Sequence, residues 1–99
     1  MTTEEFLREL DQTFTDCLVT AKNKNKDYAN SDDPFKNFRM SEQVGVSPAR
    51  AILVRISDKL SRISNLLDRE GAVTDERIED SLMDMINYSA ILKAYLKTK

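Results

Sequence analysis

Four charged side chains recur at helical spacing in the middle of the chain: Arg55, Asp58, Lys59 and Arg62. On a helix, residues three, four and seven positions apart project from one stripe. Guanidinium and ammonium groups hold phosphate oxygens through charge-assisted hydrogen bonds. The stripe therefore predicts an anion site. The alternative is a ladder of ion pairs between helices, such as Arg55 with Asp84, that fixes their register.

A second polar set lies near the C-terminus and contains Asp80, Asp84, Asn87 and Tyr88. Their spacing also places them on one side of a helix, where they can face the basic stripe. An amide side chain can read the edge of a base or ribose, and a tyrosine ring can stack on a base. The two sets together predict a polar pocket between two helices.

Large aromatic residues persist in a segment of about twenty residues where the helical period stops. Polar and charged residues are interspersed with these aromatics. The aromatic, polar and charged residues together are Lys26, Tyr28, Phe35, Lys36, Asn37, Phe38 and Arg39. Long irregular segments inside compact domains are usually functional or disordered. The rings can stack on a base while the cations face phosphate. The alternative is a lid of aromatics that closes the end of a helix bundle.

Composition excludes several classes of site. The chain has 99 residues, which predicts one domain, and its 40% hydrophobic content is typical of a folded protein. With no His and one Cys, Cys17, the chain alone has neither a zinc site nor a Ser-His-Asp triad. A net charge of −2 argues against binding duplex nucleic acid. The sequence contains no run of about 18 apolar residues, which a membrane span would need, so we expect a cytoplasmic protein.

Three long helices are predicted, over residues 2–24, 48–70 and 74–96. The second has the clearest start, because Ser47 can cap it and proline follows at the first helical position, and Gly71 can end it. The expected fold is all-α: a three-helix protomer with a long aromatic loop between helices 1 and 2, completing a helical bundle by oligomerisation to a dimer or tetramer.

Apolar stripes on the second and third helices predict the core. The second helix carries Ile52, Ile56, Leu60, Ile63 and Leu67, and the third carries Ile78, Leu82, Met85, Ile86, Ser89, Leu92 and Leu96. The other side of the third helix adds Tyr88, Ile91 and Tyr95 to its acids. That side is too apolar for a solvated face, so we expect it to be half buried against the aromatic segment or a second subunit.

Several motifs occur in a fixed order: Lys26-Asp27-Tyr28, Pro34-Phe35-x-Asn37-Phe38, Gly45-Val46-Ser47-Pro48, Arg55-x-x-Asp58-Lys59-x-x-Arg62 and Asp80-x-x-x-Asp84-x-x-Asn87-Tyr88. This order resembles a small helical family, common in phages, that is described as nucleotide-modification-associated. That family in turn is similar to the MazG-like all-α nucleotide pyrophosphohydrolases. The resemblance implies a helical fold, an oligomer, a nucleotide ligand and, for a phage protein, residence in the host cytoplasm.

The chain departs from the MazG-like pattern at its acidic positions. Those enzymes carry Glu-Glu-x-x-Glu on one helix and Glu-x-x-Asp on the next to hold Mg²⁺ on a triphosphate. Here the first pattern is replaced by a stripe with one acid, Asp58, and Ser81 stands three residues before Asp84. A positive stripe contacts phosphate directly. We therefore expect no catalytic residue, no metal and no cofactor.

The resulting hypothesis is a metal-independent nucleotide-binding protein with pockets between subunits. It resembles the viral sponges, such as anti-CBASS proteins, that sequester cyclic nucleotide immune signals. The expected ligand-binding residues are Lys26, Tyr28, Phe35, Asn37, Phe38, Arg39, Arg55, Asp58, Lys59, Arg62, Asp84, Asn87 and Tyr88.

Two alternatives remain open from the sequence. One is a Mg²⁺-dependent pyrophosphohydrolase in which Asp58, Asp80 and Asp84 hold the metal while Lys59 and Arg62 stabilise charge in the transition state. The other is a helical assembly module with no ligand, in which the charged stripe only sets the register of the helices.

Overall fold

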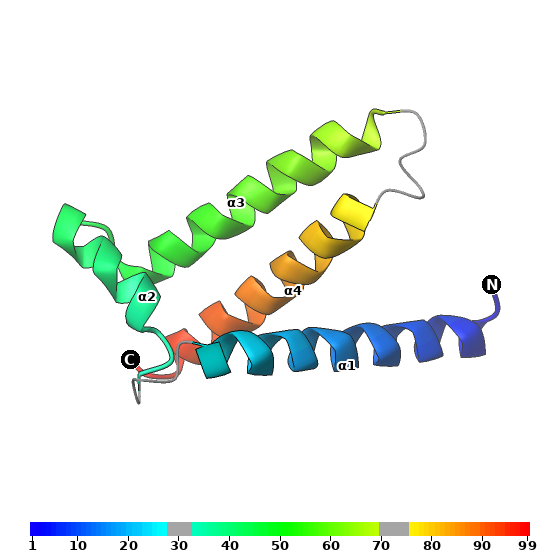
Figure 1. Ribbon diagram of the computed structural model, residues 1–99, viewed down its shortest axis with the longest axis horizontal. Helices are drawn as coiled ribbons and strands as arrows, with labels where there is room; N and C mark the ends of the chain where they lie inside the picture. The colour runs from blue at the N-terminus through cyan, green and yellow to red at the C-terminus, as the bar shows by residue number, and fades with distance from the viewer. Residues whose placement is uncertain (28–32, 70–75) are drawn as a thin grey trace. The chain divides into compact units, whose positions relative to one another are not determined.

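The computed structural model describes residues 1–27, 33–69 and 76–99, and within these ranges the chain is all-α with no strand. Two compact units divide the chain, Met1–Asp32 and Asp33–Lys99 (Figure 1). Each unit is described separately. No helix in the described ranges is long and apolar enough to cross a membrane.

The first unit consists of helix α1, Thr3–Asp27. Its start was predicted correctly: the Thr2 hydroxyl accepts a hydrogen bond from the Glu5 backbone N–H at 3.1 Å. Glu4 and Glu5 lie in the first turn, where carboxylates complement the helix dipole. The helix continues to Asp27, three residues beyond the predicted end at residue 24.

The second unit begins with two short helices in the segment for which a loop was predicted. Helix α2 spans Lys36–Arg39, and the 3₁₀ helix η1, Met40–Val44, follows it directly. The predicted three-helix protomer is therefore wrong, because in the described residues α2 lies between α1 and α3 and α4 follows. A single helical turn is too short to show a hydrophobic period, so the sequence pattern of this segment predicted a loop.

Local hydrogen bonds hold this short helical segment. The Phe38 N–H donates to the Phe35 carbonyl at 3.0 Å, and the Ser41 hydroxyl lies 2.7 Å from both the Phe38 and Val46 carbonyl oxygens. Gly45 ends η1 in the left-handed region, with φ of 79°. This conformation is unfavourable for any residue that has a Cβ atom, so glycine suits the position. The chain then turns into the next helix.

A hairpin of two long helices forms the rest of the second unit. Helix α3 spans Pro48–Leu67, and helix α4, Glu76–Leu96, runs back beside it (Figure 1). Ser47 caps α3 as predicted, since its hydroxyl accepts a hydrogen bond from the Arg50 N–H at 3.2 Å. The residues buried in the hairpin are Pro48, Ile52, Ile63 and Leu66 in α3 and Ile78, Ser81 and Tyr95 in α4.

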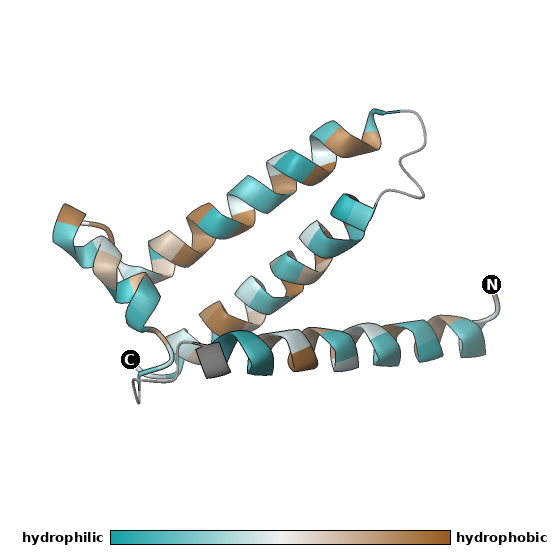
Figure 2. Ribbon diagram, viewed as in Figure 1, coloured by the Kyte–Doolittle hydropathy of each residue, from teal (hydrophilic) through white to brown (hydrophobic). Residues whose placement is uncertain are grey.

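The buried seam of α3 differs from the predicted stripe. Leu60 and Leu67 are 58% and 59% exposed, whereas Leu66 is 5% exposed. From Ile52 onward, the buried and half-buried positions of α3 are Ile52, Ile56, Lys59, Ile63 and Leu66, which alternate steps of four and three residues. Figure 2 shows hydrophobic and hydrophilic residues alternating along α3. Because α3 carries two neighbouring apolar stripes, the period alone could not decide which one meets α4.

The side of α4 that carries Tyr88, Ile91 and Tyr95 is half buried, as expected. Tyr95 is 6% exposed, and Tyr88 and Ile91 are intermediate. Phe35 and Phe38, at the N-terminal edge and inside α2, contact Tyr95 and Tyr88 respectively. The aromatic segment therefore packs against this side of α4, which was one of the two predicted ways to bury it.

Candidate functional site

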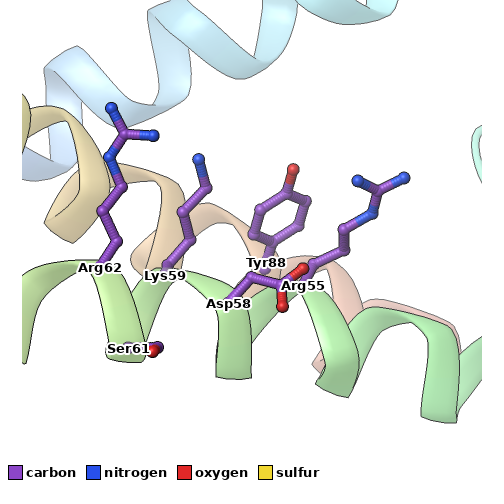
Figure 3. A pocket seen from close by; sticks show the side chains of 6 residues that line it. All are labelled: Arg55, Asp58, Lys59, Ser61, Arg62 and Tyr88. Atoms are coloured by element: carbon purple, nitrogen blue, oxygen red, sulfur yellow. The ribbon is translucent and has the colours of Figure 1, made fainter.

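A polar pocket of about 390 Å³ opens along α3 (Figure 3). Its lining residues are Arg55, Asp58, Lys59, Ser61, Arg62 and Tyr88. Tyr88 comes from α4 and the other five from α3. In Figure 3 the side chains of Arg55, Lys59 and Arg62 point the same way, and the ring of Tyr88 stands between Lys59 and Arg55. The structure thus brings the predicted charged stripe and Tyr88 together.

Lys59 joins the two helices that form the pocket. Its Nζ lies 2.9 Å from Asp84 Oδ2, and the two side chains are only 26% and 23% exposed. Asp84 therefore pairs with Lys59, whereas the sequence offered Arg55 as its partner. The difference follows from the shifted seam: Lys59 takes a position facing α4, and Arg55 lies to the side of it. The pair fixes the register of the hairpin beside the pocket.

Arg55 and Arg62 differ from Lys59 in their surroundings. Both side chains are exposed at the pocket, and neither makes an ion pair or hydrogen bond within the part of the chain that the structure describes. Arginine holds phosphate and carboxylate groups through a planar array of donors. The lining contains three cations and one carboxylate, and one of these cations, Lys59, is paired with Asp84; this composition favours an anion over a cation.

The Tyr88 ring is fixed from the side of α2. Phe38 contacts it edge-on, with ring centroids 6.4 Å apart and planes at 85°. Such T-shaped contacts are a favourable geometry for aromatic pairs. Phe38 itself does not line the pocket. Of the predicted base-stacking residues, Tyr88 therefore reaches the pocket directly, and Phe38 acts through it.

Phe35 and Arg39 lie at a second aromatic contact, around Tyr95. Phe35 meets the Tyr95 ring edge-on at 5.4 Å, and the Arg39 guanidinium lies 5.8 Å from the ring centroid. Arg39 Nε also bonds Asp33 Oδ2 at 2.6 Å. Neither residue lines the polar pocket. For these two residues the alternative of an aromatic lid fits the contacts better than ligand binding does.

The charges of this second contact stabilise each other. The hydrogen bond from Arg39, followed by the one from the Phe35 N–H, holds the pKa of the Asp33 carboxyl below its ordinary value. The same pairing with Asp33 raises the pKa of Arg39 above its ordinary value. Asp33 thereby fixes both the start of α2 and the position of the arginine.

Two further predicted ligand-binding residues, Asn37 and Asn87, are not among the pocket-lining residues. Asn37 is exposed on α2, and Asn87 is half buried on α4. Lys26 belongs to α1 in the first unit, and Tyr28 lies outside the described residues. Sequence reasoning missed Ser61, although it lies three residues after Asp58 in the pocket lining.

The acids named for the enzyme alternative do not form a metal site. Among the described residues, no group of three or more His, Cys, Asp or Glu side chains lies close enough to hold an ion. Asp84 is paired with Lys59, Asp58 lines the pocket among the cations, and Asp80 is exposed. Within one chain these three acids are therefore not gathered at one metal site, and the Mg²⁺-dependent alternative stays a prediction.

Comparison with known proteins gives one result. A family model described as nucleotide modification associated domain 1 matches residues 24–94, a range that includes α2, α3, the pocket and nearly all of α4. No curated protein and no solved structure matches the chain at a significant level. The likeness to MazG-like enzymes and to viral sponges therefore rests on the sequence motifs.

Proposed function

Because the chain belongs to the nucleotide modification associated domain 1 family, we propose that it binds a nucleotide through phosphate groups in the polar pocket of α3 and α4. The observation that carries the proposal is the pair of exposed arginines, Arg55 and Arg62, that flank Lys59 and have no ion-pair partner among the described residues. Cationic groups gathered on one stripe raise the local positive potential, and such a potential attracts anionic ligands.

The spacing of the two arginines favours a ligand with more than one phosphate. Arg55 and Arg62 are seven residues apart, which is about 10 Å along a helix. One phosphate can bind each guanidinium, with the Lys59 ammonium between them. A cyclic di- or oligonucleotide presents phosphates at separate points around a ring and fits this arrangement better than a single monophosphate.

Tyr88 supplies the contact for a base. Its ring stands beside Lys59 and Arg55 in Figure 3 and is half buried, so a face of the ring is available for stacking while Phe38 fixes its edge. Stacking on an aromatic ring is tolerant of base identity and contributes about 1–3 kcal/mol per base. The pocket would therefore select phosphates first and the base second.

We propose that the protein sequesters its nucleotide, as a sponge does, and needs no metal to bind it. Cations of the chain supply the positive charge at the phosphates, and the lining residues include one carboxylate, Asp58. A placement of the pocket between subunits stays a prediction from the sequence.

Native mass spectrometry tests the proposal. The protein is incubated with nucleoside triphosphates and cyclic di- and trinucleotides, with EDTA or with Mg²⁺. Retention of an intact cyclic nucleotide in EDTA is expected. Arg55→Gln should lose the ligand, whereas Arg50→Gln, which changes an exposed arginine of α3 outside the pocket, should keep it. Conversion of a triphosphate to a monophosphate only with Mg²⁺ would contradict the proposal.

A further inference from the structure

The polar pocket contains one acid among its cations, Asp58. Asp58 is exposed and makes no ion pair or hydrogen bond within the part of the chain that the structure describes. Arg55 stands three residues before it and Arg62 four residues after it, which are the spacings at which ion pairs form on a helix surface. The Asp58 carboxylate is therefore not used to neutralise either arginine.

A carboxylate in this place opposes the phosphate groups that the cations attract. Its negative charge lowers the positive potential of the stripe and repels phosphate oxygens. An ionised carboxylate only accepts hydrogen bonds, so it stabilises a ligand through groups that donate hydrogens. In a nucleotide these donors belong to the base and the ribose. The pocket thus combines cations for the phosphates with an acceptor for another part of the ligand.

The bases differ in what they offer to a carboxylate. The Watson–Crick edge of guanine carries two adjacent donors, N1–H and the N2 amino group, which match the two oxygens of one carboxylate. Adenine and cytosine each place a ring-nitrogen acceptor beside their amino group, and uracil and thymine place carbonyl oxygens on both sides of N3–H. Guanine alone among these bases gives a carboxylate two hydrogen bonds without turning an acceptor towards it.

Asp58 and Tyr88 line the same pocket from different helices. In Figure 3 the Asp58 carboxylate is seen below the Tyr88 ring, on the side towards Arg55. A base that stacks on the Tyr88 ring keeps its edge available for hydrogen bonds from a neighbouring side chain. The pocket volume of about 390 Å³ lies near the lower end of the range for small-molecule sites, about 300–1,000 Å³, which suits one base with its sugar and phosphate.

We propose that Asp58 determines the base specificity of the pocket and that the preferred ligand is a guanine nucleotide. The carboxylate accepts hydrogen bonds from N1–H and from the N2 amino group, while Tyr88 stacks on the base and Arg55 and Arg62 hold phosphates. This inference rests on the proposed function, because it names the base of the nucleotide that the pocket binds.

Isothermal titration calorimetry in EDTA tests the preference with two matched pairs of ligands, cyclic di-GMP with cyclic di-AMP and GTP with ATP. Within each pair the phosphates and riboses are the same, so a difference in affinity comes from the base. The wild type should bind the guanine member roughly 10- to 100-fold more tightly, because hydrogen bonds to a charged group are among the stronger ones.

Asp58→Asn tests the role of the carboxylate. The amide keeps the shape but offers one acceptor and one amino donor, a pattern that complements adenine and not guanine. Affinity for the guanine ligands should fall, and affinity for the adenine ligands should rise. A carboxylate that acted only through its charge would raise both affinities when neutralised. Asp68→Asn removes the same charge from an exposed acid at the end of α3 outside the pocket lining, and it should leave the preference unchanged.

The outcomes separate this inference from the proposed function. If none of the four ligands binds, the proposed function fails and the inference fails with it. Equal affinity for guanine and adenine ligands, as contacts to ribose hydroxyls alone would give, overturns the inference and leaves phosphate binding in place. A guanine preference that persists in Asp58→Asn also overturns it, because another group then reads the base.

Discussion

At the scale of single residues, Lys59 decides how the hairpin and the pocket are joined. It occupies a position in the buried seam of α3 where an apolar residue would pack, and its pairing with Asp84 compensates for that. A partly buried ion pair adds little net stability compared with an apolar pair, yet removing one partner leaves the other charge poorly solvated. A lysine in this place is better explained by a role at the pocket than by stability.

Removing the lysine charge should therefore destabilise the fold. Lys59→Met is expected to lower the free energy of unfolding by about 1–3 kcal/mol, because the half-buried Asp84 carboxylate loses the lysine charge beside it. Adding Asp84→Leu should recover much of that loss without restoring nucleotide binding. Urea denaturation measures both, with Lys22→Met on the exposed side of α1 as a control. Equal stability of wild type and Lys59→Met would show that the pair does not fix the hairpin.

Asp33 gives a pH-dependent contact at the start of α2. Its pKa is lowered by Arg39, so the contact is present above the ordinary carboxyl range and is lost as the pH falls through the lowered pKa. An NMR titration of the Asp33 carboxyl carbon should show a lower midpoint in the wild type than in Arg39→Gln. Identical midpoints would mean that the ion pair does not form in solution.

At the scale of elements, α2 links the aromatic segment to the pocket. Phe38 holds the edge of the Tyr88 ring, and Phe35 holds Tyr95, which lies seven residues further along α4. The aromatic residues were recognised from the sequence as unusual, but their partners were not. Tyr88 and Tyr95 share a helix face, so two aromatics spaced three residues apart in a short helix can meet both of them.

Phe38→Leu tests this link. The change keeps most of the apolar volume but removes the T-shaped contact, so we expect a stability loss of about 0.5–1.5 kcal/mol. Nucleotide affinity should fall by a fewfold because Tyr88 is less well fixed. Calorimetry measures both effects, and Met40→Leu, at a side chain that is 59% exposed in η1, serves as the control. If affinity is unchanged in Phe38→Leu, Tyr88 does not need its aromatic partner.

The two long helices of the hairpin illustrate what periodicity can and cannot predict. Their existence, the Ser47 cap and the end of α4 at Leu96 followed from capping signals and apolar spacing. These signals could not decide which of the neighbouring stripes on α3 is buried, because Leu60 and Lys59 are adjacent and a lysine was not expected in the seam. Short helices such as α2 depend on contacts made by residues far along the chain, which a local pattern does not contain.

At the scale of the whole molecule, the hairpin has two unlike faces. One carries the polar pocket with Arg55 and Arg62, and another carries the exposed leucines Leu53, Leu60 and Leu67 of α3. The charged stripe was readable from the sequence as one unit because its four residues lie on one helix. Tyr88 lies on another helix, so the sequence could predict only that it faces this stripe. The contributions of Lys26 and Tyr28 remain predictions, because neither lies in the part of the second unit that the structure describes.

The central claim is that Arg55 and Arg62 in the polar pocket hold a nucleotide without metal. Isothermal titration calorimetry of a cyclic dinucleotide in EDTA tests it most directly, comparing the wild type with Arg62→Gln and with Arg50→Gln. Loss of one charged hydrogen-bonding group is expected to cost about 1.5–3 kcal/mol, or roughly 10- to 150-fold in affinity, in Arg62→Gln only. Equal affinities of the two variants, or binding that requires Mg²⁺, would contradict the account.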